Sequence, residues 1–219
     1  KVSRSPLWLE TRLQSAGVRP ISNVVDIPNY VMLETGQPLH AFDYQKLPQK
    51  KLSVSLATSG EKLTTLDGEE RNLTDGMIVI ADGGTPIVLG GVMGGLSTEV
   101  EDNTTNILLE AALFHGTKIR RTAQALALRS ESSLRNEKGL PINNTTLAAF
   151  RAIGLLEQYA GGKVEKPLVY KGKEEKEKRT VVLRLARVAE VLGFSLEKEE
   201  IIHLLERLHF ICHEKDETS

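Results

Sequence analysis

The sequence predicts a layered α+β fold, and three features of its hydrophobic pattern indicate this class. Residues 7–16 have the apolar spacing and the end signals of an amphipathic helix. From Leu52 the hydrophobic period changes to two, which is typical of a half-buried strand. Three later runs are short and almost continuously apolar, as in strands buried on both faces, and they cover residues 77–81, 87–92 and 106–112. Helices combined with buried strands predict a layered core.

The N-terminal part should contain two helices. Ser5 is a suitable cap for the first helix, Pro6 fits its first position, and Gly17 lies just beyond its end. A second helical stretch is expected at residues 29–34, ending at Gly36.

The middle of the chain should be mainly strands. Residues 52–56 alternate Leu or Val with Ser and predict one half-buried strand. Residues 63–66 and 71–73 flank Asp67-Gly68, a dipeptide that favours the positive-φ positions of a tight turn, so a hairpin is expected here.

Composition limits the classes of protein that fit. The 219 residues are 40% hydrophobic, which is enough for one large core, and 28 Lys and Arg nearly balance 29 Asp and Glu. Such a balance is not the signature of a dedicated nucleic-acid binder, so any RNA contact should be local. No apolar run approaches the roughly twenty residues of a membrane span. The single cysteine, Cys212, favours a reducing cytoplasm, and a start without Met suggests a piece of a longer chain.

The predicted domain boundary lies in a polar, charge-mixed stretch. Residues 1–162 form the first domain, which should end with helices at 117–128 and 144–159. Residues 163–179 are expected to be a linker. Residues 180–219 suggest two helices around Gly193, the opening part of a small helix-turn-helix-like domain. A plain two-helix packing unit is at least as well supported as DNA binding, and the absence of one basic face argues against DNA binding.

A resemblance narrows the function. A series of segments, in one order along the chain, closely resembles the phenylalanyl-tRNA synthetase β subunit. These segments are residues 19–34, 36–43, 66–68, 79–82, 90–95, 106–112, 128–133 and 137–139. The resemblance implies that residues 1–162 are the central editing module of that family, a three-layer unit with mixed β-sheets and flanking helices, and that residues 180–219 begin its next domain.

The resemblance also implies an activity and partners. The module should hydrolyse the ester of mischarged Tyr-tRNA(Phe) in a pocket that receives the tRNA 3′ end, and the α subunit of the heterotetramer should carry amino-acid activation. Editing should need no cofactor, since ATP and Mg²⁺ serve only the full synthetase. The alternative is a non-catalytic tRNA-docking or structural module. A concave pocket at which Glu110, His40 and Gly94 converge would favour the enzyme.

Editing chemistry needs a group that detects the tyrosine hydroxyl. A hydrophobic pocket rejects an added hydroxyl by only about a hundredfold, whereas a site that hydrogen-bonds the hydroxyl rejects the analogue lacking it by about ten-thousandfold or more. Glu110 follows an apolar run and precedes Ala111, so it could project a carboxylate from a strand into a mostly buried setting. Residue type alone favours a solvent-exposed glutamate, but the resemblance makes Glu110 the tyrosine-reading residue.

The histidine and the glycines have two interpretations each. His40, in an apolar loop, could position the attacking water as a neutral imidazole, or it could be a structural residue. The resemblance favours the functional role. Gly94 and Gly95 could let backbone amides stabilise the ester oxygen, or they could form a bulge or a tight sheet turn.

Further pocket positions follow from the resemblance and include departures from the family pattern. Asn29, Ser130 and Ser132 match substrate-binding positions, with Ser130 where Thr is expected and Ser132 where Ala is expected. Pro28 replaces a Thr and Asn136 replaces an aromatic residue. We therefore expect a working site with altered pocket volume and selectivity.

Two other kinds of site are not predicted. No serine is marked as an activated nucleophile, so direct attack by water is the simpler mechanism. His209, Cys212 and His213 lie on one short segment without a fourth ligand nearby, and we interpret their spacing as incidental and not as a metal site.

Overall fold

The structure, a computed structural model, describes residues 1–165, 168–172 and 180–215. It divides into two compact units, residues 1–175 and 176–219. The predicted linker, residues 163–179, falls largely outside the described residues. The α+β class is confirmed. No helix of the described ranges is both long and apolar enough to cross a membrane.

The first unit begins with two helices, α1 (Leu7–Ser15) and α2 (Asn23–Thr35). The predicted cap on α1 is wrong: Pro6 occupies the N-cap position, and the Ser5 hydroxyl donates instead to the buried Asp26 carboxylate at 2.6 Å. Helix α2 begins earlier than predicted and contains Pro28 in its interior. Propensity places such a proline near a helix boundary, but burial of the surrounding turns in the core outweighs that preference.

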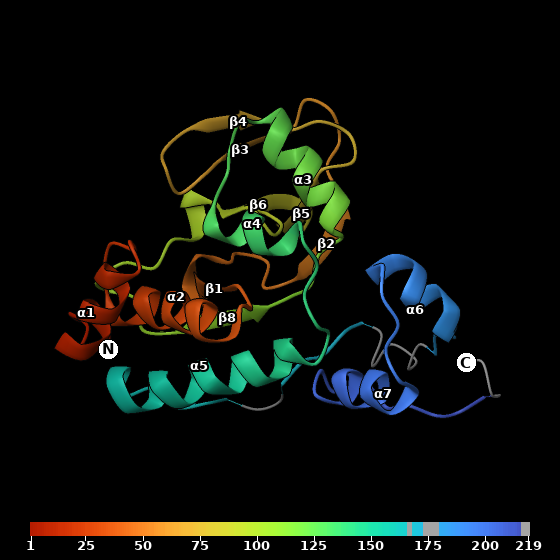
Figure 1. The fold of residues 1–219 in the computed structure, drawn as a ribbon. Coiled ribbons are helices and arrows are strands. Elements are labelled where there is room, and N and C mark those ends of the chain that lie inside the picture. The colour runs from red at the N-terminus through yellow and green to blue at the C-terminus, as the bar shows by residue number, and fades with distance from the viewer. Residues whose placement is uncertain (166–167, 173–179, 216–219) are drawn as a thin grey trace. The chain divides into compact units, whose positions relative to one another are not determined.

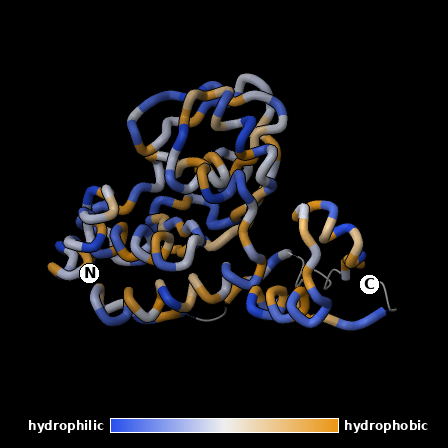
Figure 2. Tube along the Cα trace, viewed as in Figure 1, coloured by the Kyte–Doolittle hydropathy of each residue, from blue (hydrophilic) through white to orange (hydrophobic). Residues whose placement is uncertain are grey.

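The two halves of the unit are joined by an antiparallel ribbon of β1 (Leu39–Asp43) and β8 (Ile107–Ala111). Helix α5 (Asn144–Ala160) and α2 pack on each other and against this ribbon. Gly161 ends α5 in the left-handed conformation, as expected for a C-terminal glycine. Figure 2 shows hydrophobic and hydrophilic residues alternating along α5, because one side of the helix faces the core.

A four-stranded sheet, in the order β2-β5-β6-β7, forms the other half. Its strands are β2 (Leu52–Leu56), β5 (Ile78–Asp82), β6 (Thr85–Leu89) and β7 (Met93–Gly94). Beside it lies the predicted hairpin, β3 (Lys62–Thr64) with β4 (Glu70–Asn72). In Figure 1 the ribbon lies between α5, below it, and the sheet with its hairpin and helices, above it.

The strands differ from expectation in three respects. All strand pairs of the described chain are antiparallel, so the parallel pairing that mixed sheets require is not among them. β5 is buried throughout as predicted, whereas β8 is only partly buried. The prediction of a half-buried β2 is wrong, because it is an edge strand whose Leu52, Val54 and Leu56 are 37%, 68% and 52% exposed.

Two helices, α3 (Gly116–Ala125) and α4 (Glu131–Asn136), follow β8 and pack on each other. The second is too short to be evident from hydrophobic spacing. Two short 3-10 turns, η1 (Tyr44–Lys46) and η2 (Leu96–Thr98), complete the unit.

The second unit contains the two predicted helices. These are α6 (Leu185–Leu192), which ends at Gly193 with φ of 79°, and α7 (Lys198–Glu206), with Glu199 and Glu200 in its first turn.

Candidate functional site

The ribbon sets the central pair of the site. In its antiparallel register His40 lies directly opposite Glu110. Residues directly opposite on neighbouring strands project from the same face with Cβ atoms about 5 Å apart. The two side chains, seventy residues apart in sequence, are therefore neighbours because of the strand register.

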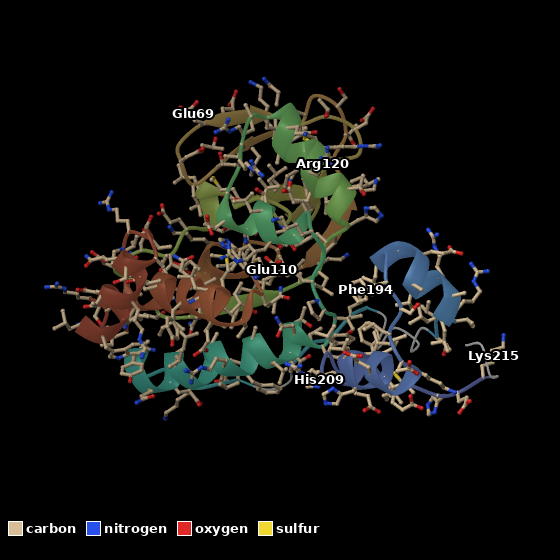
Figure 3. All side chains as sticks on the ribbon, in the orientation of Figure 1. Glu69, Glu110, Arg120, Phe194, His209 and Lys215 are labelled. Atoms are coloured by element: carbon tan, nitrogen blue, oxygen red, sulfur yellow. The ribbon has the colours of Figure 1, made fainter. Side chains whose placement is uncertain are left out.

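A cavity of about 220 Å³ opens beside this pair. Its walls come from α2, β1, β6, β7, β8 and α4. Figure 3 labels Glu110, which lies on β8 in the middle of the unit. Six predicted site residues line the cavity: Asn29, His40, Gly94, Glu110, Ser130 and Ser132.

Gly95, the seventh predicted site residue, does not line this cavity. Its N–H donates to the Ile87 carbonyl at 2.9 Å, and a Cβ at residue 95 would collide with the same carbonyl. Gly95 therefore serves close packing of backbone against β6, which is the sheet-turn alternative for this glycine.

Among the described residues, packing and not hydrogen bonding holds His40 in place. Its ring lies edge-on to Phe42, with centroids 4.6 Å apart, and its Nε2 atom is buried without a partner among the described residues. Burial lowers the pKa of His40 to about 4, because the imidazolium would lose its hydration. The imidazole is therefore neutral at pH 7, with one N–H donor and one lone pair.

Glu110 is a carboxyl group in a poorly hydrated place. Burial raises its pKa to about 7, and its side chain makes no hydrogen bond or ion pair within the described part of the chain. In that part of the chain no cation neutralises the carboxyl group and no hydrogen-bond donor fixes its orientation. Its oxygens are therefore free to bond a group that enters the cavity. Residue type alone favoured a solvent-exposed glutamate, but Glu110 is partly buried on β8.

Helix α4 is fastened to the glycine-rich turn by side chains. The Ser130 hydroxyl donates to the Val92 carbonyl at 2.5 Å and accepts from the Ser133 N–H as the N-cap of a capping box. The Ser132 hydroxyl donates to the Gly91 carbonyl at 3.1 Å. Both serines line the cavity, but each uses its O–H within the protein and keeps only acceptor capacity for a ligand.

Several amides of the turn are also committed. The N–H groups of Gly90 and Val92 donate to the carbonyls of Ile78 and Leu89. These two amides, like that of Gly95, cannot stabilise an ester oxygen without losing a protein hydrogen bond.

The sequence-based reasoning missed several walls of the cavity. Apolar surface comes from residues such as Met32, Leu66 and Phe114, and Glu131 lies at α4. They approach from separate elements, and no local pattern marks them. Asn136 was noted only as a departure, yet it is buried and lines the cavity.

Two other places in the described residues were candidates for a functional site. A wider hollow of about 620 Å³ is lined by Arg120, Ala123, Gln124, Ala127, Arg129, Glu137 and Lys138. None of the predicted site residues lies there. His209, Cys212 and His213 do not form a metal-binding group in the part of the chain described.

The fold and the cavity define an α+β domain with a small, partly polar cavity. Comparison with known families narrows this class: the sequence profile of the B3/4 domain matches residues 1–161. The chain belongs to the B3/4 domain family.

Three relatives that align with nearly the whole of this chain are phenylalanine–tRNA ligase β subunits. The chain is 49% identical over 209 residues to the phenylalanine–tRNA ligase β subunit of Moorella thermoacetica and 45% identical over 210 residues to that of Bacillus licheniformis. These alignments cover 95% and 96% of this chain, and 26% of each relative. The Halalkalibacterium halodurans β subunit is 45% identical over 218 residues, or 100% of this chain and 27% of its own length. The chain thus spans about a quarter of the length of these relatives.

Proposed function

We propose that this chain is the post-transfer editing domain of a phenylalanine–tRNA ligase β subunit and that it hydrolyses the ester of Tyr-tRNA(Phe). The observation that carries the proposal is the convergence of Glu110, His40 and Gly94 on one cavity, with the carboxyl of Glu110 free of partners among the described residues. Similarity to ligase β subunits supports the same assignment.

Glu110 selects the substrate in this proposal. With a pKa of about 7, a substantial fraction of its carboxyl groups is ionised at neutral pH, and a carboxylate accepts the phenol O–H of tyrosine. A phenylalanyl group offers no donor, so it would leave the carboxylate desolvated and unpaired. Discrimination comes from this penalty.

Hydrolysis uses water directly. The water oxygen bonds to the ester carbonyl carbon, the bond from that carbon to the ribose oxygen breaks, and a water proton passes to the ribose oxygen. His40 holds the water: its ring lies on Gly94 beside Glu110, and a neutral imidazole offers a hydrogen bond without adding charge to the pocket. Its low pKa assigns it to positioning of the water and not to strong general-base catalysis.

The remaining wall completes the pocket. Asn29 on α2 lines the cavity, and its amide makes no hydrogen bond within the described residues. It is therefore free to bond the substrate. Ser130 and Ser132 support substrate binding chiefly by holding α4 in place, since their O–H groups donate to carbonyls of the glycine-rich turn.

The partners follow from the same proposal. They are the mischarged 3′ end of tRNA and, in the complete synthetase, the α subunit. The editing step requires no cofactor, and ATP with Mg²⁺ belongs to amino-acid activation elsewhere in the synthetase. The cytoplasm is the compartment of such an enzyme.

Release of labelled tyrosine from Tyr-tRNA(Phe) tests the proposal. The chain is expected to accelerate release over buffer, and His40→Ala is expected to slow it by about a hundredfold, the usual scale for loss of a positioned catalytic group. Tight binding of Tyr-tRNA without any acceleration would favour the rival, a docking module, and would refute the editing proposal.

A further inference from the structure

Four buried polar atoms have no hydrogen-bond partner in the described residues: Trp8 Nε1, Gln37 Oε1, His40 Nε2 and Asn136 Oδ1. Two of them, on His40 and Asn136, belong to residues that line the candidate cavity. The proposed function gives His40 a task but gives Asn136 none.

The orientation of the Asn136 amide is fixed by its surroundings. Its Nδ2 donates to the Gly91 carbonyl at 3.3 Å, to the Ser132 carbonyl at 3.1 Å and to the Ser132 hydroxyl at 3.2 Å. A flipped amide would place its oxygen against two carbonyl oxygens, which cannot donate. The network therefore assigns the unpartnered position to the acceptor oxygen, Oδ1.

An unpartnered acceptor in this setting is costly. Asn136 is 2% exposed, and most buried side-chain polar atoms in proteins have a partner. Because the residue also forms a wall of the cavity, the missing donor can come from a ligand. A hydrogen bond made there is strengthened by the low local dielectric.

Within the tyrosyl group of the ester the hydrogen-bond donors are few, and this inference rests on the proposed function. The phenol has one O–H, which Glu110 takes, so it cannot also serve Asn136. The α-ammonium group has three N–H donors and carries a positive charge, and hydrogen bonds to charged groups are the stronger ones. We infer that Asn136 Oδ1 accepts a hydrogen bond from the α-ammonium group of the substrate. Asn136 is thus a specificity-determining residue for the amino end of the aminoacyl group.

Binding of two matched ligands tests the inference without requiring hydrolysis. L-Tyrosinamide and 3-(4-hydroxyphenyl)propionamide share the phenol and the carboxamide and differ only in the amino group. Titration of the full chain, followed by calorimetry or NMR, is expected to give about tenfold tighter binding of L-tyrosinamide, from one charge-assisted hydrogen bond.

Two variants separate recognition from support of α4. Asn136→Leu removes the acceptor and also the bonds to the Gly91 and Ser132 carbonyls. Ser133→Ala removes the side-chain bonds of Ser133 in the capping box of α4, lies outside the cavity lining and leaves Oδ1 in place. The preference for the amino ligand should disappear in Asn136→Leu and persist in Ser133→Ala, with thermal unfolding to check that both fold.

The outcomes are distinct. Equal affinities of the two amides for the wild-type chain, or no binding of either, would overturn the inference, and so would a preference that survives in Asn136→Leu. Because the wild-type comparison needs no variant, equal affinities there overturn the inference even if Asn136→Leu fails to fold. Failure to hydrolyse Tyr-tRNA(Phe) by a chain that still prefers L-tyrosinamide would instead count against the proposed editing reaction alone.

Discussion

The imidazole of His40 occupies the space that a side chain on Gly94 would need. A Cβ built on Gly94 would lie 2.7 Å from His40 Nε2 and closer still to Cε1. Carbon and nitrogen atoms in contact are normally about 3.5 Å apart or more. Gly94 thus forms the floor on which the histidine ring lies.

Gly94→Ala should therefore displace His40 from its position. We expect deacylation of Tyr-tRNA(Phe) to fall by about a hundredfold, as is seen when a reacting geometry moves by about an ångström. Gly154→Ala is the matched control. Gly154 lies on helix α5, and its Cβ would point into open space, with no neighbouring atom within 4 Å beyond the helix's own backbone. It should keep full activity and gain about 0.5–1 kcal/mol of stability. Equal activities of the two variants would show that the contact with His40 is irrelevant.

The opposite pKa shifts of His40 and Glu110 should nearly cancel in the pH dependence of the free energy of unfolding. Folding lowers the pKa of His40 from 6.5 to about 4, so its contribution is present above pH 6.5 and is lost as pH falls toward 4. Folding raises the pKa of Glu110 from 4.5 to about 7, so its contribution is present below pH 4.5 and is lost as pH rises toward 7.

Between about pH 4.5 and 6.5 these two effects have opposite signs. In the unfolded chain the shared proton is on the histidine, and in the folded chain it is on the glutamate, so the number of bound protons hardly changes. Urea unfolding at pH 5 and pH 6.5 should show that His40→Asn is relatively less stable at the higher pH, whereas Glu110→Gln is relatively less stable at the lower pH. If the free energy of unfolding changed equally between the two pH values in both variants, these protonation states of buried His40 and Glu110 would be excluded.

The hydrogen bond from the Ser130 hydroxyl of α4 to the glycine-rich turn should contribute measurably to the free energy of unfolding. Ser130→Ala removes the N-cap and the bond to the Val92 carbonyl, and should destabilise the chain by about 1–2 kcal/mol in urea unfolding. Ser53→Ala, on the exposed strand β2, is the control and should change stability by less than about 0.5 kcal/mol. If Ser130→Ala lowered the free energy of unfolding no more than Ser53→Ala, the role of Ser130 in holding α4 on the glycine-rich turn would be contradicted.

Helix α3 ends with strain that one substitution should relieve. Ala127 has a φ of 48°, a left-handed conformation that glycine adopts more readily, and the Leu128 N–H closes the helix end on the Ala123 carbonyl. Ala127→Gly should raise the midpoint of thermal unfolding, by the few degrees that about 0.5–1 kcal/mol gives a chain of this size. A lower midpoint would show that the methyl group contributes more by packing than it costs in strain.

Much of this architecture was predictable because the relevant signals are local. A short, continuously apolar run indicated β5, helix end signals indicated α5, and Asp67-Gly68 indicated the β3–β4 hairpin. The errors arose where a tertiary contact decides. Ser5 donates to Asp26, a partner twenty-one residues away, and β2 is exposed because it is an edge strand, which a period of two cannot reveal.

The site shows the same division. The resemblance selected Glu110 and His40, and the strand register explains why they are adjacent. Neither residue type nor spacing could show that the Ser130 and Ser132 hydroxyls donate to the glycine turn, or that Gly95 packs on β6 instead of lining the cavity. Those facts depend on how α4 and β6 meet in three dimensions.

Glu110 carries the central claim, because selection by a hydrogen-bonding carboxyl requires the preference for tyrosine to depend on it. The direct measurement is the ratio of deacylation rates on Tyr-tRNA(Phe) and Phe-tRNA(Phe) for the wild-type chain and for Glu110→Ala. We predict that the wild type strongly prefers the tyrosyl ester and that the variant reduces this ratio by a hundredfold or more, in line with the penalty for a missing hydroxyl. A variant with the wild-type ratio would contradict the account.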